Sequence, residues 1–268
     1  MVNENITCII QARLSSSRLP GKILMHGYDK PLLLHLLERI KKSKFIKKII
    51  IATTYEKIDK PIKDICKKNK IEYFSGHPTD VLSRYYNCAK KNKIKNILRI
   101  TSDCPLIDYK IIDEVIKKFF SSDFDYVSNI HPASAPDGFD VEIFKFSALK
   151  KAFFKAKKKH EREHVTPYIW DNEYKFKKAN VLFHPKKKLH DRYRLTLDYL
   201  DDYFLIWNIY NFLYPKKKYF SLNDILKFLR KNKNMITNKK LIKVNWYRNS
   251  LSKLKTINKN DTNLKAKV

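Results

Sequence analysis

Glycine is scarce in this sequence, and no apolar run is long enough to cross a membrane. Only four of the 268 residues are glycine, although glycine makes up about 7% of an average protein. A membrane-spanning helix needs a stretch of about 18 or more apolar residues, and none is present. The first residues also lack the charged-then-apolar layout of a signal peptide. We therefore expect a cytoplasmic protein that has no membrane partner.

Cysteine is equally sparse, and the four cysteines are far apart. Cys8, Cys66, Cys88 and Cys104 form no close pair with the spacing of metal ligands. We expect four free thiols in a reducing compartment, and neither a disulfide framework nor a zinc site.

Acidic residues are heavily outnumbered by basic ones. The chain has 57 Lys and Arg against 27 Asp and Glu, a net charge of +30. Such a charge is found in nucleic-acid-binding proteins, but here no zinc-finger spacing, RNA-binding aromatic signature or basic-region heptad accompanies it. The lysines are spread along almost the whole chain. We expect solvated lysine-rich faces, no nucleic-acid partner, and a positive field that favours a polyanionic substrate such as a nucleoside triphosphate.

The first half of the chain alternates between strand-like and helix-like segments. Repeated strand–helix–strand units predict an α/β fold with a doubly wound, mostly parallel sheet, whose ligands lie beyond the carboxyl ends of the strands. The expected strands are 6–10, 49–52, 71–74 and 97–100, and the expected helices begin at Pro31, Ile58, Val81 and Tyr109.

The pattern changes in the second half. Strand-like segments at 139–146, 174–183 and 192–197, with a helix at 147–158, predict a small mixed section inserted at about 130–198. Helices are expected at 199–214, which is rich in aromatic residues, and at 222–229. We expect one domain over 1–231, followed by a basic tail over 232–268 that is at least partly disordered, above all at 254–268.

The loop after the first strand is suited to binding phosphate. It reads Gln-Ala-Arg-Leu-Ser-Ser-Ser-Arg-Leu-Pro-Gly-Lys from Gln11 to Lys22. Phosphate oxygens need charge-assisted donors and free backbone N–H groups, and this loop supplies both. Its spacing matches neither a Walker A loop nor a G-x-G-x-x-G loop. We expect exposed cations here, and we expect Gly21 to serve a backbone need for close approach or positive φ.

Further motifs follow this loop in order. They are Thr79–Tyr85, Thr101–Asp108, Pro136–Glu142, Arg162–Tyr168 and Arg194–Asp198. Together with Ala12-Arg13 and Ser17–Lys22, they resemble the superfamily of CMP-KDO synthetases and acylneuraminate cytidylyltransferases. The closest likeness is to the branch of spore-coat polysaccharide biosynthesis protein F, and it spans about residues 6–215.

This resemblance implies a fold and an activity. The fold is the Rossmann-like, GT-A-like fold of nucleotidyltransferases. The activity is the transfer of CMP from CTP, with Mg²⁺, to a sugar-type acceptor, with release of pyrophosphate. The family's well-known acceptors are acidic 2-keto sugars, which implies a role in surface polysaccharide or glycoconjugate synthesis. Relatives are commonly homodimers with the mixed section at the interface, so we expect a homodimer in which about 130–198 serves the acceptor and dimerisation. The aromatic-rich segment 199–214 is compatible with such a dimer.

The resemblance also assigns residues to the nucleotide. Arg13 and Lys22 are the expected catalytic cations, and Asp80 and Arg84 are placed near the cytosine. Asp80 could equally cap the helix that begins at Val81. The full expected nucleotide site is Gln11, Ala12, Arg13, Ser17, Arg18, Gly21, Lys22, Thr53, Asp80, Arg84 and Asp103.

Two carboxylates are candidates for a magnesium site. Asp103 lies just past the fourth expected strand, and Asp198 lies at the end of the strand expected at 192–197. Magnesium in proteins is typically held by one or two carboxylates together with phosphates and water. Asp198 could instead cap the helix at 199. Asp202, in the first turn of that helix, is expected to interact with the helix dipole.

The acceptor is expected to meet Asp137, Asp140, Glu142, His164 and Arg194. Carboxylates can accept from sugar hydroxyls, and Arg194 could hold an acceptor carboxylate or phosphate with two hydrogen bonds. His164 could orient the attacking hydroxyl or be a structural histidine. A glycosyltransferase that uses Asp123-Phe124-Asp125 as a metal site is the alternative function, and pyrophosphate release from CTP distinguishes the two.

Overall fold

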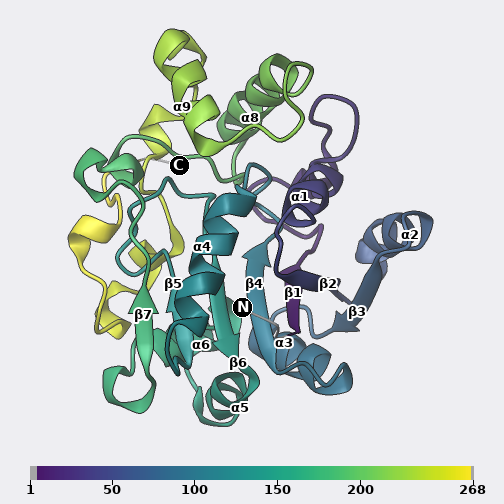
Figure 1. Ribbon diagram of the computed structural model, residues 1–268, viewed down its shortest axis with the longest axis vertical. Helices are drawn as coiled ribbons and strands as arrows, with labels where there is room; N and C mark the ends of the chain where they lie inside the picture. Colours follow the sequence, from purple (N-terminus) through teal and green to yellow (C-terminus); the bar gives the residue numbers. More distant parts are fainter. Residues whose placement is uncertain (1–4, 267–268) are drawn as a thin grey trace.

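The computed structural model describes residues 5–266, which form one seven-stranded sheet in the order β3-β2-β1-β4-β6-β5-β7 (Figure 1). Strands β1 to β4 are mutually parallel, whereas β6 runs antiparallel to both of its neighbours, β4 and β5. The strands are β1 (Ile6–Gln11), β2 (Ile46–Thr54), β3 (Glu72–Gly76), β4 (Asn96–Thr101), β5 (Tyr126–Ser128), β6 (Glu142–Lys145) and β7 (Lys178–Asn180).

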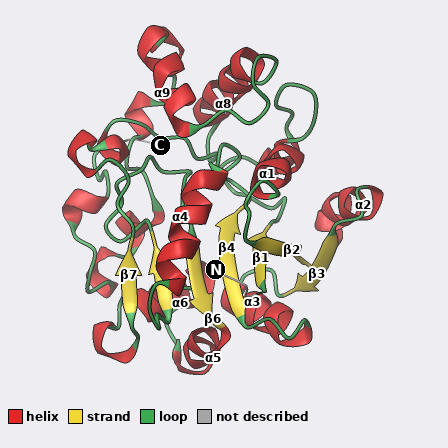
Figure 2. Cartoon of the chain, in the orientation of Figure 1, coloured by secondary structure: helices red, strands yellow, loops and turns green. Residues whose placement is uncertain are grey.

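Helices pack on both faces of this sheet (Figure 2). The side chains of β1 alternate between the faces, with Ile6, Cys8 and Ile10 in one core and Ile9 in the other. Such burial on both faces is typical of a central parallel strand. The helices are α1 (Leu32–Ile40), α2 (Lys60–Lys68), α3 (Val81–Lys91), α4 (Tyr109–Phe120), α5 (Phe146–Lys155), α6 (Lys159–His164), α7 (Pro167–Trp170), α8 (Leu200–Leu213) and α9 (Leu222–Lys231).

The order of the strands creates a crevice beside β1. The chain proceeds outward from β1 through β2 to β3, and then β4 pairs with the opposite side of β1. The loops after β1 and β4 therefore diverge at the carboxyl edge of the sheet. Such a switch point is where open α/β sheets bind their ligands. The predicted α/β fold is confirmed.

The mixed section differs in detail from the prediction. Only β7 is a strand within 174–183, and β5 was not predicted. The segment 192–197 is not a strand, apart from one isolated bridge between Asp137 and Arg194. Its backbone N–H groups instead bond to neighbouring loops: Leu195 donates to the carbonyl of Asp137 and Leu197 to that of Asp103, both at 2.8 Å.

The C-terminal segment, defined here as residues 232–266, is packed against the rest of the chain, where the sequence predicted disorder. It contains several short 3-10 turns and runs along the β7 side of the molecule (yellow in Figure 1). Leu241, Val244 and Leu254 are buried. The segment has few apolar residues, but polar contacts also hold it against the rest of the chain. The buried carboxylate of Asp171 accepts from the backbone N–H groups of Lys255 and Thr256. Residues 267 and 268 of the predicted disordered tail lie outside the described residues.

All four cysteines are buried free thiols. Within residues 5–266, no helix is both long enough and apolar enough to cross a membrane.

Candidate active site

A cavity of about 1340 Å³ opens at the switch point. The loops after β1 and β4 form its floor, with Ala12, Arg13 and Asp103 among the lining residues. Residues of α6 form another wall, and residues 244–250 and 264–266 of the C-terminal segment complete it. Of the residues predicted to bind nucleotide or acceptor, it is lined by Gln11, Ala12, Arg13, Ser17, Arg18, Lys22, Arg84, Asp103, Asp137, Asp140 and His164.

The loop after β1 is held in shape by a buried carboxylate. Asp59, which is fully buried, accepts from the backbone N–H of Leu14 at 2.7 Å and from the hydroxyl of Thr54. The N–H of Gly21 donates to the carbonyl of Leu14 at 3.0 Å, and Gly21 has a φ of 70°. The predicted backbone need at Gly21 is therefore present. The sequence analysis missed Asp59, because a single acid after β2 carries no motif.

Lys22 is buried, so the expectation of an exposed loop cation is wrong for this residue. Its Nζ donates to Oδ1 of Asp198 at 2.7 Å and to the carbonyl of Leu197 at 2.6 Å, and lies 3.4 Å from Oδ2 of Asp103. Burial alone would lower the pKa of Lys22, but the two carboxylates outweigh it and hold the pKa above its ordinary value. The ammonium group therefore stays charged.

The two arginines of the loop are more accessible. Nη1 of Arg13 donates to the carbonyl of Pro78 at 3.3 Å, and its side chain is half-buried at the cavity wall. Nη2 of Arg18 donates to Oδ1 of Asp198 at 2.6 Å, and 40% of its side chain is exposed. Both guanidinium groups are thus within reach of an anion that enters the cavity.

Asp103 and Asp198 meet at the ammonium group of Lys22, although they are far apart in sequence. The loop after β4 binds the segment before α8 through two bonds to the carbonyl of Asp103, from the Leu197 N–H and the Thr196 hydroxyl. Burial raises the pKa of Asp198, but Lys22, Arg18 and Arg194 outweigh it and lower the pKa to about 2. The group is therefore a carboxylate at neutral pH.

Hard oxygen donors of this kind suit magnesium, which needs few protein ligands when phosphates and water supply the rest. Within residues 5–266, no cluster of three or more His, Cys, Asp or Glu side chains is arranged to hold a metal by itself. Asp103 and Asp198 supply the one or two carboxylates that a magnesium ion uses.

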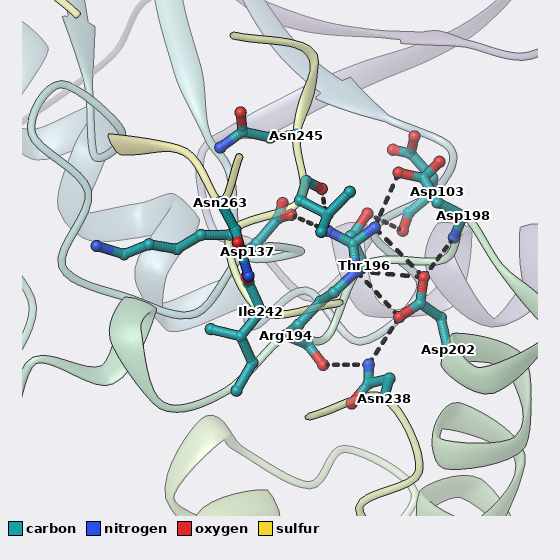
Figure 3. A network of polar contacts seen from close by, with 12 residues as sticks. Asp103, Asp137, Arg194, Thr196, Asp198, Asp202, Asn238, Ile242, Asn245 and Asn263 are labelled. Atoms are coloured by element: carbon teal, nitrogen blue, oxygen red, sulfur yellow. Dashed lines mark hydrogen bonds and ion pairs between the residues drawn. The ribbon is translucent and has the colours of Figure 1, made fainter. Parts of the chain in front are cut away.

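Arg194 lies at the centre of a buried network beside this pair (Figure 3). Its Nε and Nη2 both donate to the carboxylate of Asp202, and Nη2 also donates to Asp198 at 3.0 Å. Its Nη1 donates to Asp137 at 3.0 Å and to the carbonyl of Val244 at 2.7 Å. All five N–H groups thus have protein acceptors, and the side chain is 1% exposed. In this arrangement Arg194 has no donor left for an acceptor molecule, contrary to its predicted role.

Asp202 does more than interact with a helix dipole. It is fully buried and accepts from the backbone N–H groups of Asp198 and Tyr199, both at 3.0 Å. It thereby caps α8 and fixes the backbone that carries Asp198. Its place in the first turn of the helix could be predicted, but its bonds to the backbone before α8 depend on the fold.

On the acceptor side, Asp137 and Asp140 line the cavity, but Glu142 does not. Burial raises the pKa of Asp137 to about 6, with Arg194 opposing the shift and Asp198 adding to it. Burial and the neighbouring Asp137 raise the pKa of Asp140 well above its ordinary value. Glu142 is 1% exposed and bonded to Arg99, Tyr126 and Thr166, so its contacts are structural and do not match the predicted acceptor role.

His164 lines the cavity and stacks on Trp246, with ring centroids 3.8 Å apart and planes 12° from parallel. Burial, together with nearby cations such as Arg99, lowers its pKa to about 3. The imidazole is neutral at pH 7 and too weakly basic to be an efficient general base. It can still orient a hydroxyl as a hydrogen-bond partner.

Asp80 and Arg84, which were predicted near the cytosine, make structural contacts. Asp80 caps α3 by accepting from Ser83 N–H at 3.0 Å and also pairs with Arg162. Arg84 is buried, donates to the carbonyls of Ala52, His77 and Pro78, and lines the cavity. Thr53 is fully buried and does not line the cavity, and its hydroxyl has no hydrogen-bond partner among the described residues.

The C-terminal segment contributes to the cavity, which its sequence did not indicate. Asn245, Trp246, Tyr247 and Arg248 line the cavity. The residues around them are mostly Lys, Asn and Ser, so the composition gives no sign that Trp246 and Tyr247 line a cavity.

Cations and paired carboxylates at the switch point of a mostly parallel sheet are features of a nucleotidyltransferase-type site. The sequence profile of the cytidylyltransferase family matches residues 7–246, and the chain belongs to that family. It is therefore a nucleotidyltransferase enzyme, and the resemblance noted from the motifs is confirmed.

Individual relatives agree with this assignment. The spore coat polysaccharide biosynthesis protein SpsF of Bacillus subtilis is 33% identical over 173 residues, which are 62% of this chain and 70% of that protein. A 3-deoxy-manno-octulosonate cytidylyltransferase of Geobacter sulfurreducens is 30% identical over 112 residues, which are 42% and 44% of the two chains. A solved cytidylyltransferase from Leptospira borgpetersenii is 37% identical, with a TM-score of 0.81 over 87% of this chain and 97% of the other.

Proposed function

We propose that this enzyme transfers CMP from CTP, with Mg²⁺, to a sugar-type acceptor and releases pyrophosphate, in the synthesis of a surface polysaccharide or glycoconjugate precursor. The observation that carries the proposal is the meeting of Lys22, Asp103 and Asp198 at the switch point of the sheet. The names of the relatives from Bacillus and Geobacter support the acceptor class. An acidic 2-keto sugar is the acceptor that we favour.

In this proposal the triphosphate lies along the loop after β1. Arg13 and Arg18 reach the cavity from the loop and supply charge-assisted donors to the phosphate oxygens. Lys22 is held charged between two carboxylates, so it is preorganised to stabilise the negative charge that develops as pyrophosphate leaves. Because the ammonium group is already in place, no reorganisation of the protein is needed during the reaction.

Asp103 and Asp198 would hold the magnesium ion beside the triphosphate. When bound, the ion polarises the α-phosphate and the attacking oxygen and neutralises developing charge. Arg194 and Asp202 act through Asp198, since they fix its carboxylate and its backbone. The acceptor lies on the side of Asp137 and Asp140, whose carboxyl groups can accept from its hydroxyls. His164, in its neutral form, can orient the attacking hydroxyl.

The proposal is tested by nucleotide-dependent stabilisation and by product release. A ligand that binds the native state raises its stability by RT ln(1 + [L]/Kd), so CTP with Mg²⁺ should raise the melting temperature more than ATP or GTP with Mg²⁺. Pyrophosphate release should then require CTP together with a sugar acceptor from a panel. Equal thermal shifts for all three nucleotides would overturn the choice of CTP. Strong CTP binding without pyrophosphate release on any sugar would overturn the acceptor class.

A further inference from the structure

A second cavity, of about 600 Å³, adjoins the first on the side away from the phosphate-binding loop. The two cavities share Asp137 and Asp140, and also Asn245, Trp246 and Tyr247 of the C-terminal segment. The carboxylates assigned to the acceptor hydroxyls therefore stand at the junction of the two cavities. A molecule that reacts in the first cavity can extend past them into the second.

A half-buried histidine in this second cavity has two buried ring nitrogens that lack hydrogen-bond partners in the described part of the chain. His131 lines it, and within residues 5–266 neither of its ring nitrogens has a partner. Buried polar atoms are nearly always paired, so such an exception calls for an explanation. Burial lowers the pKa of His131 to about 4, which leaves the imidazole neutral at pH 7, with one donor and one acceptor nitrogen. This is the pairing that a hydroxyl group satisfies.

Aromatic rings surround His131. Trp170 lies against it with ring centroids 4.2 Å apart, and Tyr247 is 6.2 Å away. Both rings line the second cavity, as does Trp246. Aromatic faces combined with a few polar groups are typical of small-molecule sites, and they suit the apolar face of a sugar ring.

The lysines of this cavity are already engaged. Lys243 pairs with Asp191 and donates to the carbonyl of Asn260 at 2.7 Å, and Lys178 donates to the carbonyl of Trp170 at 2.6 Å. An acidic group would therefore find no ready cation here, whereas Arg13 and Arg18 stand in the first cavity. The second cavity favours a neutral, hydroxyl-bearing group.

The outer wall of this cavity is the C-terminal segment, whose part after residue 246 lies outside the family match. Tyr247, Thr256, Ile257, Asn258 and Asp261 line the cavity from that side. The segment is tied to the active site, because Arg194 donates to the carbonyl of Val244 and Asn238 bonds to Asp202 and to the carbonyl of Arg194 (Figure 3). Because Arg194 also donates to Asp198, the position of the C-terminal segment is coupled to that of Asp198.

From these observations we infer that the second cavity binds the neutral, hydroxylated end of the acceptor sugar, with the ring nitrogens of His131 as hydrogen-bond partners and the C-terminal segment as the specificity-determining wall. This inference rests on the proposed function and adds the location of the acceptor and the residues that select it. It makes His131 and Ala133, neither of which lines the first cavity, determinants of acceptor affinity alone.

The test is steady-state kinetics with CTP, Mg²⁺ and a panel of 3-deoxy-manno-octulosonate, N-acetylneuraminate and neutral aldoses. With the panel member that gives pyrophosphate release, His131→Phe keeps a flat ring but removes both nitrogens, so KM for the sugar should rise about three- to tenfold, the usual cost of one hydrogen bond. KM for CTP should stay within twofold. His26→Phe, at an exposed position outside both cavities, is the matched control and should leave both constants unchanged.

A second variant tests the same cavity in case His131→Phe does not fold. Ala133→Phe adds bulk to the cavity wall without removing a side-chain hydrogen bond, so it should raise KM for the sugar more than tenfold while the CTP-induced thermal shift persists. If both folded variants kept the wild-type KM for the sugar, the pocket assignment would be wrong. If no sugar in the panel released pyrophosphate from CTP in the wild-type enzyme, the proposed function would fail first, and the assignment with it.

Discussion

Gly21 and Gly138 both have positive φ, but their surroundings differ. At Gly21 (φ 70°) a Cβ would meet nothing within 4 Å, whereas at Gly138 (φ 100°) it would lie 2.4 Å from the backbone carbonyl of Leu195. Gly21→Ala should therefore cost only the backbone strain, about 1–2 kcal/mol in the free energy of unfolding. Gly138→Ala adds a backbone clash and should cost about 3 kcal/mol or more. Urea denaturation measures both, and equal losses would contradict the close approach.

His164 gives the enzyme a pH dependence with a definite sign. Its folded pKa, about 3, lies below the unfolded value of about 6.5, so its contribution to stability is complete above pH 6.5 and is lost as pH falls toward 3. Between pH 7 and pH 5, the wild type should lose about 1–2 kcal/mol through this residue. His164→Phe should flatten that slope in urea titrations, and the exposed His26→Phe should keep it. An unchanged slope in His164→Phe would show that the imidazole is not buried in its neutral form.

The sequence predicted individual residues unevenly. It placed Arg13, Arg18 and Lys22 on one loop, and this succeeded because a contiguous motif carries its own geometry. It could not show that Lys22 is buried or that Arg194 has all its donors paired, because both facts depend on carboxylates from distant segments. Asp59 and His131 lie in no motif at all. Burial and missing partners are visible only in three dimensions.

At the scale of elements, Asp103 and Asp198 should act as one unit. Asp103→Asn and Asp198→Asn should each abolish magnesium-dependent turnover, and the double variant should be scarcely worse than either single variant, because residues that act together are non-additive. Pyrophosphate release measures this effect, and circular dichroism checks the fold, since Asp198 also binds Arg18, Lys22 and Arg194. Rate losses that multiply in the double variant would show that the two carboxylates do not share a metal.

Asp103 and Asp198 lie close together although the strand predicted before Asp198 is absent. Asp198 was expected at the carboxyl end of a strand, but residues 192–197 form no strand. Asp198 reaches Asp103 because loop-to-loop hydrogen bonds replace a sheet ladder. By contrast, the helices Val81–Lys91 and Tyr109–Phe120 begin at the predicted residues, since each has a regular apolar stripe and an aspartate cap. Local sequence patterns determine those helices, whereas contacts between distant segments determine the loops that carry Asp103 and Asp198.

The C-terminal segment is held at its far end by Asp171. One carboxylate oxygen accepts from the N–H of Lys255 at 2.8 Å, and from the N–H and hydroxyl of Thr256 at 2.9 and 3.1 Å. Asp171→Ala should speed hydrogen exchange at the amides of residues 255 and 256 at least tenfold, with a loss of about 1–3 kcal/mol in stability. The exposed Asp123→Ala is the matched control. Unchanged exchange at these amides would mean that other contacts hold the segment.

For the whole molecule, the net charge and the charge of the site have the same sign. The chain carries +30, and nine Lys and Arg side chains line the cavity against five Asp and Glu side chains. Both the long-range field and the cavity therefore attract a nucleoside triphosphate.

The last prediction concerns the oligomeric state. Leu200, Phe204 and Trp207 lie on one side of α8, four and three residues apart, and are 51%, 46% and 42% exposed. A contiguous apolar patch of this kind marks an interaction surface, and a symmetric dimer would bury it against its own copy. We expect a homodimer in sedimentation velocity at micromolar concentration, and Phe204→Lys should convert it to a monomer with the same secondary structure.

The control is Phe154→Lys, at an aromatic residue on α5 that is more exposed than Phe204, and it should leave the dimer intact. A lysine on the α8 face places like charges opposite each other across a two-fold axis, so its effect on association should exceed that of any single truncation. A wild type that sediments as a monomer would contradict the expectation of a dimer. A dimer that survives Phe204→Lys but dissociates with Phe154→Lys would move the interface from α8 to the mixed section.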